Sequence, residues 1–164
     1  MSLLPNRVPY RTMFDLTRSS FEMKTNFEEG DFDYYEGSIM VFQPRQTTNK
    51  IFPSAGNPAE KPIGVALTGR QLGETANATA FGVMPRSSLY GNPFSVVVGY
   101  GEMLLYTMLY DPTEQFYLGE QVKAVAGGLL AANTCAGKLI EQSTVISLPI
   151  GTEDPYLGVR MTIK

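Results

Sequence analysis

The residues that could carry out chemistry in this chain are few, and histidine is absent from its 164 residues. A catalytic serine or cysteine needs a base to take its proton, and histidine is the commonest one. Ser87 and Ser88 stand beside Arg86 without a lysine close in sequence, and the single cysteine, Cys135, has no basic sequence neighbour that would lower its pKa. We expect an inert thiol, and a Ser/Lys hydrolase would need a lysine brought in by the fold.

Carboxylates are the other candidates for chemistry. Residues 28–36 hold an acidic cluster made of Glu28, Glu29, Asp31, Asp33 and Glu36. The cluster lacks the spacing of an EF-hand loop, and neighbours in sequence such as Glu153 and Asp154 are not thereby facing carboxylates. The chain also has no tryptophan to form a sugar-binding platform. We expect a solvent-facing or partner-facing acidic loop, no metal, no cofactor and no enzymatic activity.

Composition limits the partners. The net charge is −3 and there is no basic run, so nucleic acid is not expected to bind. Charged residues make up 18% of the chain, against about 25% in ordinary soluble domains, which leaves neutral surface for assembly. No window has the run of apolar residues that spans a membrane, and residues 1–11 lack the apolar core of a secretory signal. We expect a protein made in a cell's cytoplasm without a membrane partner.

Along the chain, segments rich in β-branched and aromatic residues alternate with turns that contain glycine or proline. Strands are expected at residues 37–42, 62–68, 94–100, 102–110, 118–125, 138–148 and 156–164, with a short step at 51–52. Residues 74–83 are ambiguous between helix and strand. Gly64 and Gly158 each interrupt a β-branched run, which predicts a bulge, a bend or a close backbone. This pattern predicts an all-β fold, a small barrel or sandwich-like domain of short antiparallel strands.

Residues 1–33 keep no clean helical or alternating period, and we interpret them as an extended N-terminal arm before a domain at residues 34–164. The aromatic residues Phe14, Phe21 and Phe27 are spaced along this arm and could dock on a neighbouring protein. The alternative is that the segment packs across its own domain.

Within residues 34–164 the chain resembles the capsid cement, or decoration, proteins of tailed bacteriophages. The resemblance rests on Pro62-Ile63-Gly64-Val65-Ala66-Leu67, Gly99-Tyr100-Gly101-Glu102, Leu118-Gly119-Glu120-Gln121-Val122-Lys123 with Gly127-Gly128-Leu129-Leu130, and Leu157-Gly158-Val159-Arg160-Met161. It implies a small β-barrel domain, with no enzymatic activity, on the outer capsid surface of the virion. There it would bridge neighbouring major capsid protein subunits and stabilise the head.

We expect such a protein to act as a homo-oligomer, a dimer or a trimer, and to bind the capsid through a defined set of residues. This partner-binding set contains Phe14, Phe21, Phe27, Glu28, Glu29, Asp31, Asp33, Arg86, Tyr90 and Asn92. The alternative function is a carbohydrate- or receptor-binding β module of a head fibre or tail component. That module would need an exposed aromatic groove, which Tyr90, Asn92 and Tyr100 could supply only in part.

Overall fold

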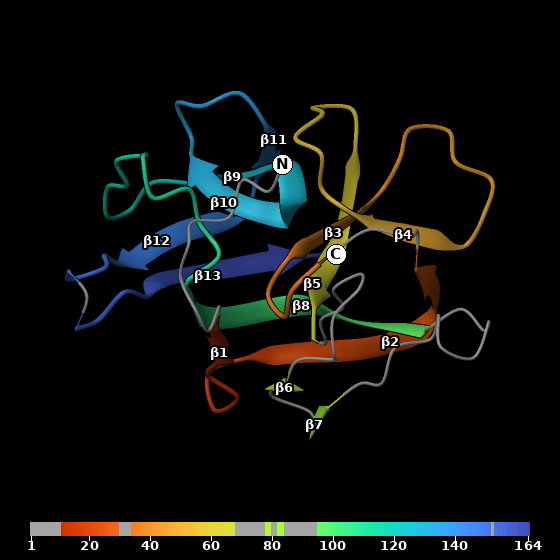
Figure 1. Cartoon of the computed structure of the whole chain (residues 1–164), viewed down its shortest axis with the longest axis horizontal. Coiled ribbons are helices and arrows are strands. Elements are labelled where there is room, and N and C mark those ends of the chain that lie inside the picture. Colours follow the sequence, from red (N-terminus) through yellow and green to blue (C-terminus); the bar gives the residue numbers. More distant parts are fainter. Residues whose placement is uncertain (1–10, 30–33, 68–77, 80–81, 84–94, 152) are drawn as a thin grey trace.

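The structure, a computed structural model, describes residues 11–29, 34–67, 78–79, 82–83, 95–151 and 153–164 (Figure 1). The main sheet consists of β1 (Thr12–Phe14), β2 (Ser20–Glu29), β3 (Ile39–Phe42), β4 (Lys50–Pro53), β5 (Lys61–Ala66), β8 (Ser95–Thr107), β12 (Ser143–Ser147) and β13 (Leu157–Ile163). A second sheet consists of β9 (Val122–Val125), β10 (Leu129–Ala132) and β11 (Lys138–Ile140), and a hairpin pairs β6 (Ala78–Thr79) with β7 (Gly82–Val83). A short 3₁₀ turn, Ala126–Gly128, joins β9 to β10.

The long strand β8 organises the main sheet. Strands β1 and β2 pair along one of its edges, and β13 and β5 pair along the other. A break was expected at Gly101, but β8 runs through this residue without interruption. Gly101 has a φ of +113°, and a Cβ there would lie 2.9 Å from the Ser20 carbonyl oxygen of β2. Glycine therefore lets one long strand bend where another residue would be strained.

The prediction of a mainly β, sandwich-like fold is confirmed. Figure 1 shows the β9–β10–β11 sheet next to β12, with β13 and β8 following below in the view. Hydrogen-bonded neighbours lead from β8 through β2, β4, β3 and β5 back to β8. The β2–β4 and β5–β8 junctions each hold only two residue pairs, and the β2–β4 pairing is parallel. The described strands therefore form a sandwich-like arrangement in place of a regular closed barrel.

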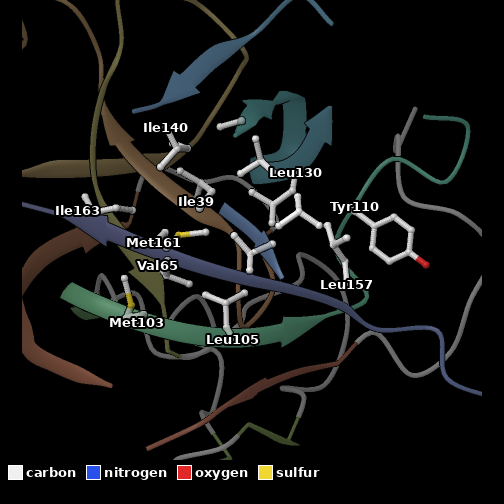
Figure 2. Packing of buried hydrophobic residues seen from close by; sticks show 14 of the residues in the cluster. Ile39, Val65, Met103, Leu105, Tyr110, Leu130, Ile140, Leu157, Met161 and Ile163 are labelled. Atoms are coloured by element: carbon white, nitrogen blue, oxygen red, sulfur yellow. The ribbon is translucent and has the colours of Figure 1, made fainter. Parts of the chain in front are cut away.

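The main core lies between the two sheets. Met103, Leu105 and Met161 of the main sheet and Leu130 and Ile140 of the second sheet are all buried in one cluster. Figure 2 shows Ile140 and Ile163 toward one end of this cluster and Tyr110 and Leu157 toward the other. Burying one side chain of this size contributes about 1.5–3 kcal/mol, so packing between the sheets is the main source of stability.

A smaller core covers the opposite face of β3, β4 and β5. On β3, Ile39 and Val41 belong to the main core, whereas Met40 between them joins Ile51 and Ala66 in the smaller core. This alternation follows from the two-residue period of a strand. Strand β3 is therefore buried on both sides, which explains its nearly continuous apolar sequence.

The two interrupting glycines stand where strands approach closely, as predicted. A Cβ on Gly64 would lie within 3.0 Å of both Val98 Cγ1 and the Gly99 carbonyl oxygen of β8. The β3–β5 register also shifts beside it, between Met40 and Val41. A Cβ on Gly158 would lie 2.8 Å from the Cβ of Ser147 and 2.9 Å from the ring of Tyr106. Both glycines are required by packing.

Several predicted boundaries need correction. Residues 118–121 are a turn and its flanks, so only β9 remains of the strand expected at 118–125. Residues 138–148 contain two strands, β11 and β12, separated by a turn at Glu141 and Gln142. Strand β8 ends at Thr107, three residues before the expected end at residue 110. In the ambiguous stretch 74–83, the described residues are the strands β6 and β7.

The segment interpreted as an arm is structured within its own domain. Strands β1 and β2 pair along β8, so the alternative in which this segment packs across its own domain holds for residues 12–29. The apolar residues Phe21, Met23 and Phe27 stand at odd positions of a strand whose partner lies some 75 residues later in the chain. This alternation is the usual sequence signal of a strand, and it was overlooked because the residues before it keep no regular period.

Candidate docking surface

The structure places only part of the predicted partner-binding set. Phe14 and Phe21 are described in full. The backbones of Phe27, Glu28 and Glu29 lie at the C-terminal end of β2. There Phe27 pairs with β8, and the two glutamates pair with β4. The remaining members, Asp31, Asp33, Arg86, Tyr90 and Asn92, lie outside the described residues.

Phe14 and Phe21 anchor β1 and β2 to the sheet. Their ring centroids are 6.0 Å apart at an interplanar angle of 46°, and both side chains pack half-buried against the main core. The Phe21 ring covers Gly99, where a Cβ would lie 3.1 Å from it. These aromatics are engaged inside the molecule, because their rings fill the space beside β8. They are therefore poor candidates for direct contact with a partner.

Three other apolar side chains of the same segment face solvent. Met13 is 47% exposed on β1, Leu16 is 61% exposed in the connection to β2, and Met23 is 59% exposed on β2. Exposed large apolar side chains are candidate contacts for another protein. The sequence does not reveal them, because polar Thr12 is buried while apolar Met13 beside it is exposed, the reverse of what their polarity predicts.

The loop that carries Leu16 is held in one conformation. The Asp15 carboxylate accepts hydrogen bonds from the Thr17 hydroxyl at 2.7 Å, the Thr17 amide at 3.1 Å and the Arg18 amide at 3.2 Å. The Ser19 hydroxyl donates to the Asp15 carbonyl, and it accepts from the Leu104 amide of β8. The bond from the Thr17 hydroxyl, above all, lowers the pKa of the Asp15 carboxyl. A loop fixed in this way loses little conformational entropy when it binds.

A second group of exposed apolar residues lies at the end of the molecule formed by the β12–β13 hairpin and the connection before β9 (Figure 1). Tyr117 is 57%, Leu118 62% and Ile150 68% exposed. The connection is pinned to β12, because the Gly119 amide donates to the Val145 carbonyl at 2.8 Å and the Val145 amide donates to the Glu120 carbonyl at 2.9 Å. These side chains are therefore also presented from a fixed backbone.

Two buried aromatic residues, Tyr110 and Phe116, pack beneath this end of the molecule. The Tyr110 and Phe116 rings are both buried and meet edge to face with centroids 5.8 Å apart. The Tyr110 hydroxyl donates to the Pro155 carbonyl at 2.8 Å, which ties the chain before β9 to the β12–β13 hairpin. Such an aromatic pair adds about 0.5–1.5 kcal/mol beyond its burial.

Glu60 is a buried acid that sequence reasoning did not single out. Its carboxylate is 3% exposed and accepts hydrogen bonds from the Ser54 hydroxyl at 2.9 Å and from the amides of Ala55 and Asn57 at 2.9 and 3.1 Å. These bonds fold residues 54–60 into a compact loop before β5. A lone glutamate in a proline-rich connection gave no sign of this, because its partners are mostly backbone groups.

The described residues show no activated nucleophile. Cys135 is half-buried against the main core, and burial, with a smaller effect from Glu114, raises the pKa of its thiol. A raised pKa favours the protonated thiol, which is the less reactive form. Ser87 and Ser88 lie outside the described residues, while Glu153 and Asp154 are both exposed. Within the part that the structure describes, no three acids or cysteines gather to hold a metal ion.

Tyr100, which was considered for a sugar-binding groove, is engaged with a neighbouring strand. Its hydroxyl donates to the Glu22 carboxylate of β2 at 2.6 Å, and this bond is the main cause of the raised pKa of the phenol. The pair joins β2 to β8 on the outer face of the sheet.

Comparison with known protein families and with curated proteins gives no match to this chain. In the described part of the chain, no helix has the length and apolar character needed to cross a membrane.

Proposed function

We propose that this chain is a virion structural protein, a cement protein that binds the outer surface of a tailed-phage head. In this function it bridges major capsid protein subunits and stabilises the shell, as a dimer or a trimer. The proposal is supported by the resemblance of four segments and by the sandwich-like β fold that contains them.

The observation that carries the proposal is the presentation of large apolar side chains from fixed backbone. Leu16 projects from the loop held by Asp15, and Tyr117 and Leu118 project from the connection pinned to β12. Single exposed apolar residues are common on proteins, but Leu16, Tyr117 and Leu118 stand on loops that hydrogen bonds hold in place. This arrangement suits docking on a rigid neighbour, because little entropy is lost on binding. Repetition over a shell then gives a large collective effect.

Point substitutions test these surfaces more cleanly than truncation, since removing residues 12–29 would remove β1 and β2 from the sheet. The experiment uses heads isolated without the protein from the virus that encodes it. Occupancy is measured by co-sedimentation with the wild-type protein, with Leu16→Ser and with Leu118→Ser. Thr47→Ala, at an exposed position of another loop, is the matched control.

Loss of one buried leucine contact of about 2 kcal/mol should weaken binding roughly 30-fold. At least one leucine variant should show this loss while the control binds like the wild type. Full occupancy by both leucine variants would contradict the proposed docking surface. Binding to a cell-surface glycan in place of the head would favour a carbohydrate- or receptor-binding β module.

A further inference from the structure

A groove of about 440 Å³ lies between the start of β5, strand β11 and the end of β13. Its apolar lining includes Ile63, Ile140 and Ile163, and Lys61 and Lys138 lie among its charged residues. Figure 2 shows Ile140 and Ile163 toward the same end of the core, and both residues line this groove. None of these residues belongs to the docking surfaces described above.

The groove exists because two strands leave the same edge of β8. Strand β13 pairs with β8 as far as Ile163 opposite Gly101, and β5 begins its pairing at Val65 opposite Gly99. The first part of β5 therefore cannot occupy the edge of β8, which β13 already fills. It diverges from β13, and the close approach at Gly64 lets it do so without displacing β8.

An open strand edge borders the groove. All three residues of β11 line it, and β11 pairs only with β9 among the described strands. Across the groove, Lys61 and Pro62 pair with β3 on their other side, and Pro62 has no amide to donate. Strand β11 can therefore accept an added strand, while β5 serves as the opposite wall.

The charge of the groove is opposite to that of the chain. Lys61, Lys138 and Lys164 all line it, whereas the whole chain has a net charge of −3. The lining also holds two acids, the exposed Glu141 and Glu60, whose carboxylate accepts hydrogen bonds from neutral groups of its own loop, so the three lysines outnumber the acids by one. Lys138 donates one hydrogen bond, to the Pro58 carbonyl at 3.1 Å, and an ammonium group has three donors.

We propose that this groove binds an extended peptide segment with acidic side chains, added as a strand alongside β11. Lys138 and Ile140 are two residues apart on β11, as are Lys61 and Ile63 on β5, so each lysine shares a face with an isoleucine. One face of the added strand would therefore carry both the apolar side chains that contact the isoleucines and the carboxylates that meet Lys61 and Lys138. The lysines also disfavour neutral or basic strands at an edge that would otherwise accept any of them. The inference rests on the groove alone and does not depend on the proposed function.

The probe is a fluorescein-labelled peptide of about six residues in which every second residue is in turn glutamate or valine and serine fills the other positions, compared with the same peptide carrying glutamine in place of glutamate. Fluorescence anisotropy measures binding to the full chain, to Lys61→Gln and to the Lys61→Gln/Lys138→Gln double variant. Lys50→Gln, an exposed lysine away from the groove, is the control. Thermal unfolding of each variant checks that it is folded.

The glutamate peptide should bind at least about tenfold more tightly than the glutamine peptide, and the double variant should lose this preference. Added salt should weaken binding, and the β11 amides should shift in NMR spectra while the β12 amides do not. The proposal is overturned if both peptides bind equally or if Lys50→Gln has the same effect as the double variant. It is also overturned if inorganic phosphate, at a concentration that supplies the same negative charge as the peptide, displaces the peptide. The proposal would also be overturned if the protein formed a dimer without any peptide and the second copy covered the groove.

Discussion

Replacing Gly64 with alanine should destabilise the protein strongly, because β5 crosses β8 at this residue. An added Cβ would lie within 3.0 Å of Val98 Cγ1 and of the Gly99 carbonyl oxygen, whereas ordinary contact begins at 3.4 Å. Val98 is 1% exposed and its side chain has little room to move. The carbonyl oxygen belongs to the central strand, so it can move only if β8 moves with it.

The expected magnitude follows from these two contacts. Overfilling a packed core costs about 1–3 kcal/mol, and a contact with backbone lies at the upper end. Gly64 does not have a positive φ, so alanine adds no conformational strain and even gains about 0.4–1 kcal/mol from the unfolded state. We expect Gly64→Ala to lower the free energy of unfolding by about 2 kcal/mol.

Urea unfolding measures this change as a lower midpoint with an unchanged slope. Gly119→Ala is the control, since a Cβ there meets nothing within 4 Å and its only cost is the left-handed φ of +84°, about 1 kcal/mol. Gly158→Ala should fall between the two, because its close neighbours are side chains of Ser147 and Tyr106. A Gly64→Ala variant as stable as Gly119→Ala would refute the close crossing of β5 over β8.

Two further predictions concern buried and exposed hydrogen bonds. Glu60→Gln should lower the free energy of unfolding in urea by about 2 kcal/mol, because the amide nitrogen cannot accept the hydrogen bond from the Ala55 amide. Glu141→Gln, at an exposed position, should change it by less than about 0.5 kcal/mol. Equal effects of the two substitutions would contradict the buried network. The raised pKa of Tyr100 means that its bond to Glu22 stabilises the fold fully below the ordinary phenol pKa, near 10, and that this contribution is lost as pH rises through the folded-state pKa. Ultraviolet titration of the phenols should therefore show one group moving to lower pH in Glu22→Gln, and superimposable curves would refute the pairing.

The sequence was sufficient to predict the fold class because its strong strands are punctuated by glycine and proline. Strands β3 and β13 fall inside the ranges expected for them and β5 begins one residue before its range, and Gly64 and Gly158 mark close approaches as their positions in β-branched runs indicated. These features are local, so composition and spacing within a few residues can reveal them.

Features that depend on distant partners were not predictable in this way. Strand β2 does place Phe21, Met23 and Phe27 at alternate positions, but nothing in its own residues identifies β8 as its partner, and the segment was interpreted as part of an arm. Phe21 and Met23 lie on the same face of β2, yet only Phe21 packs against the main core while Met23 is exposed, a difference set by distant residues. The groove beside β11 likewise arises from three strands far apart in the chain.

The most direct test of the proposed function is a binding titration of the purified protein on expanded phage heads that lack it. Co-sedimentation gives the bound amount, and release of packaged DNA on heating gives the strength of the shell. The proposal predicts saturable binding and a higher temperature of DNA release with increasing occupancy. Heads that bind no protein, or that bind it without any gain in heat resistance, would contradict a cement function.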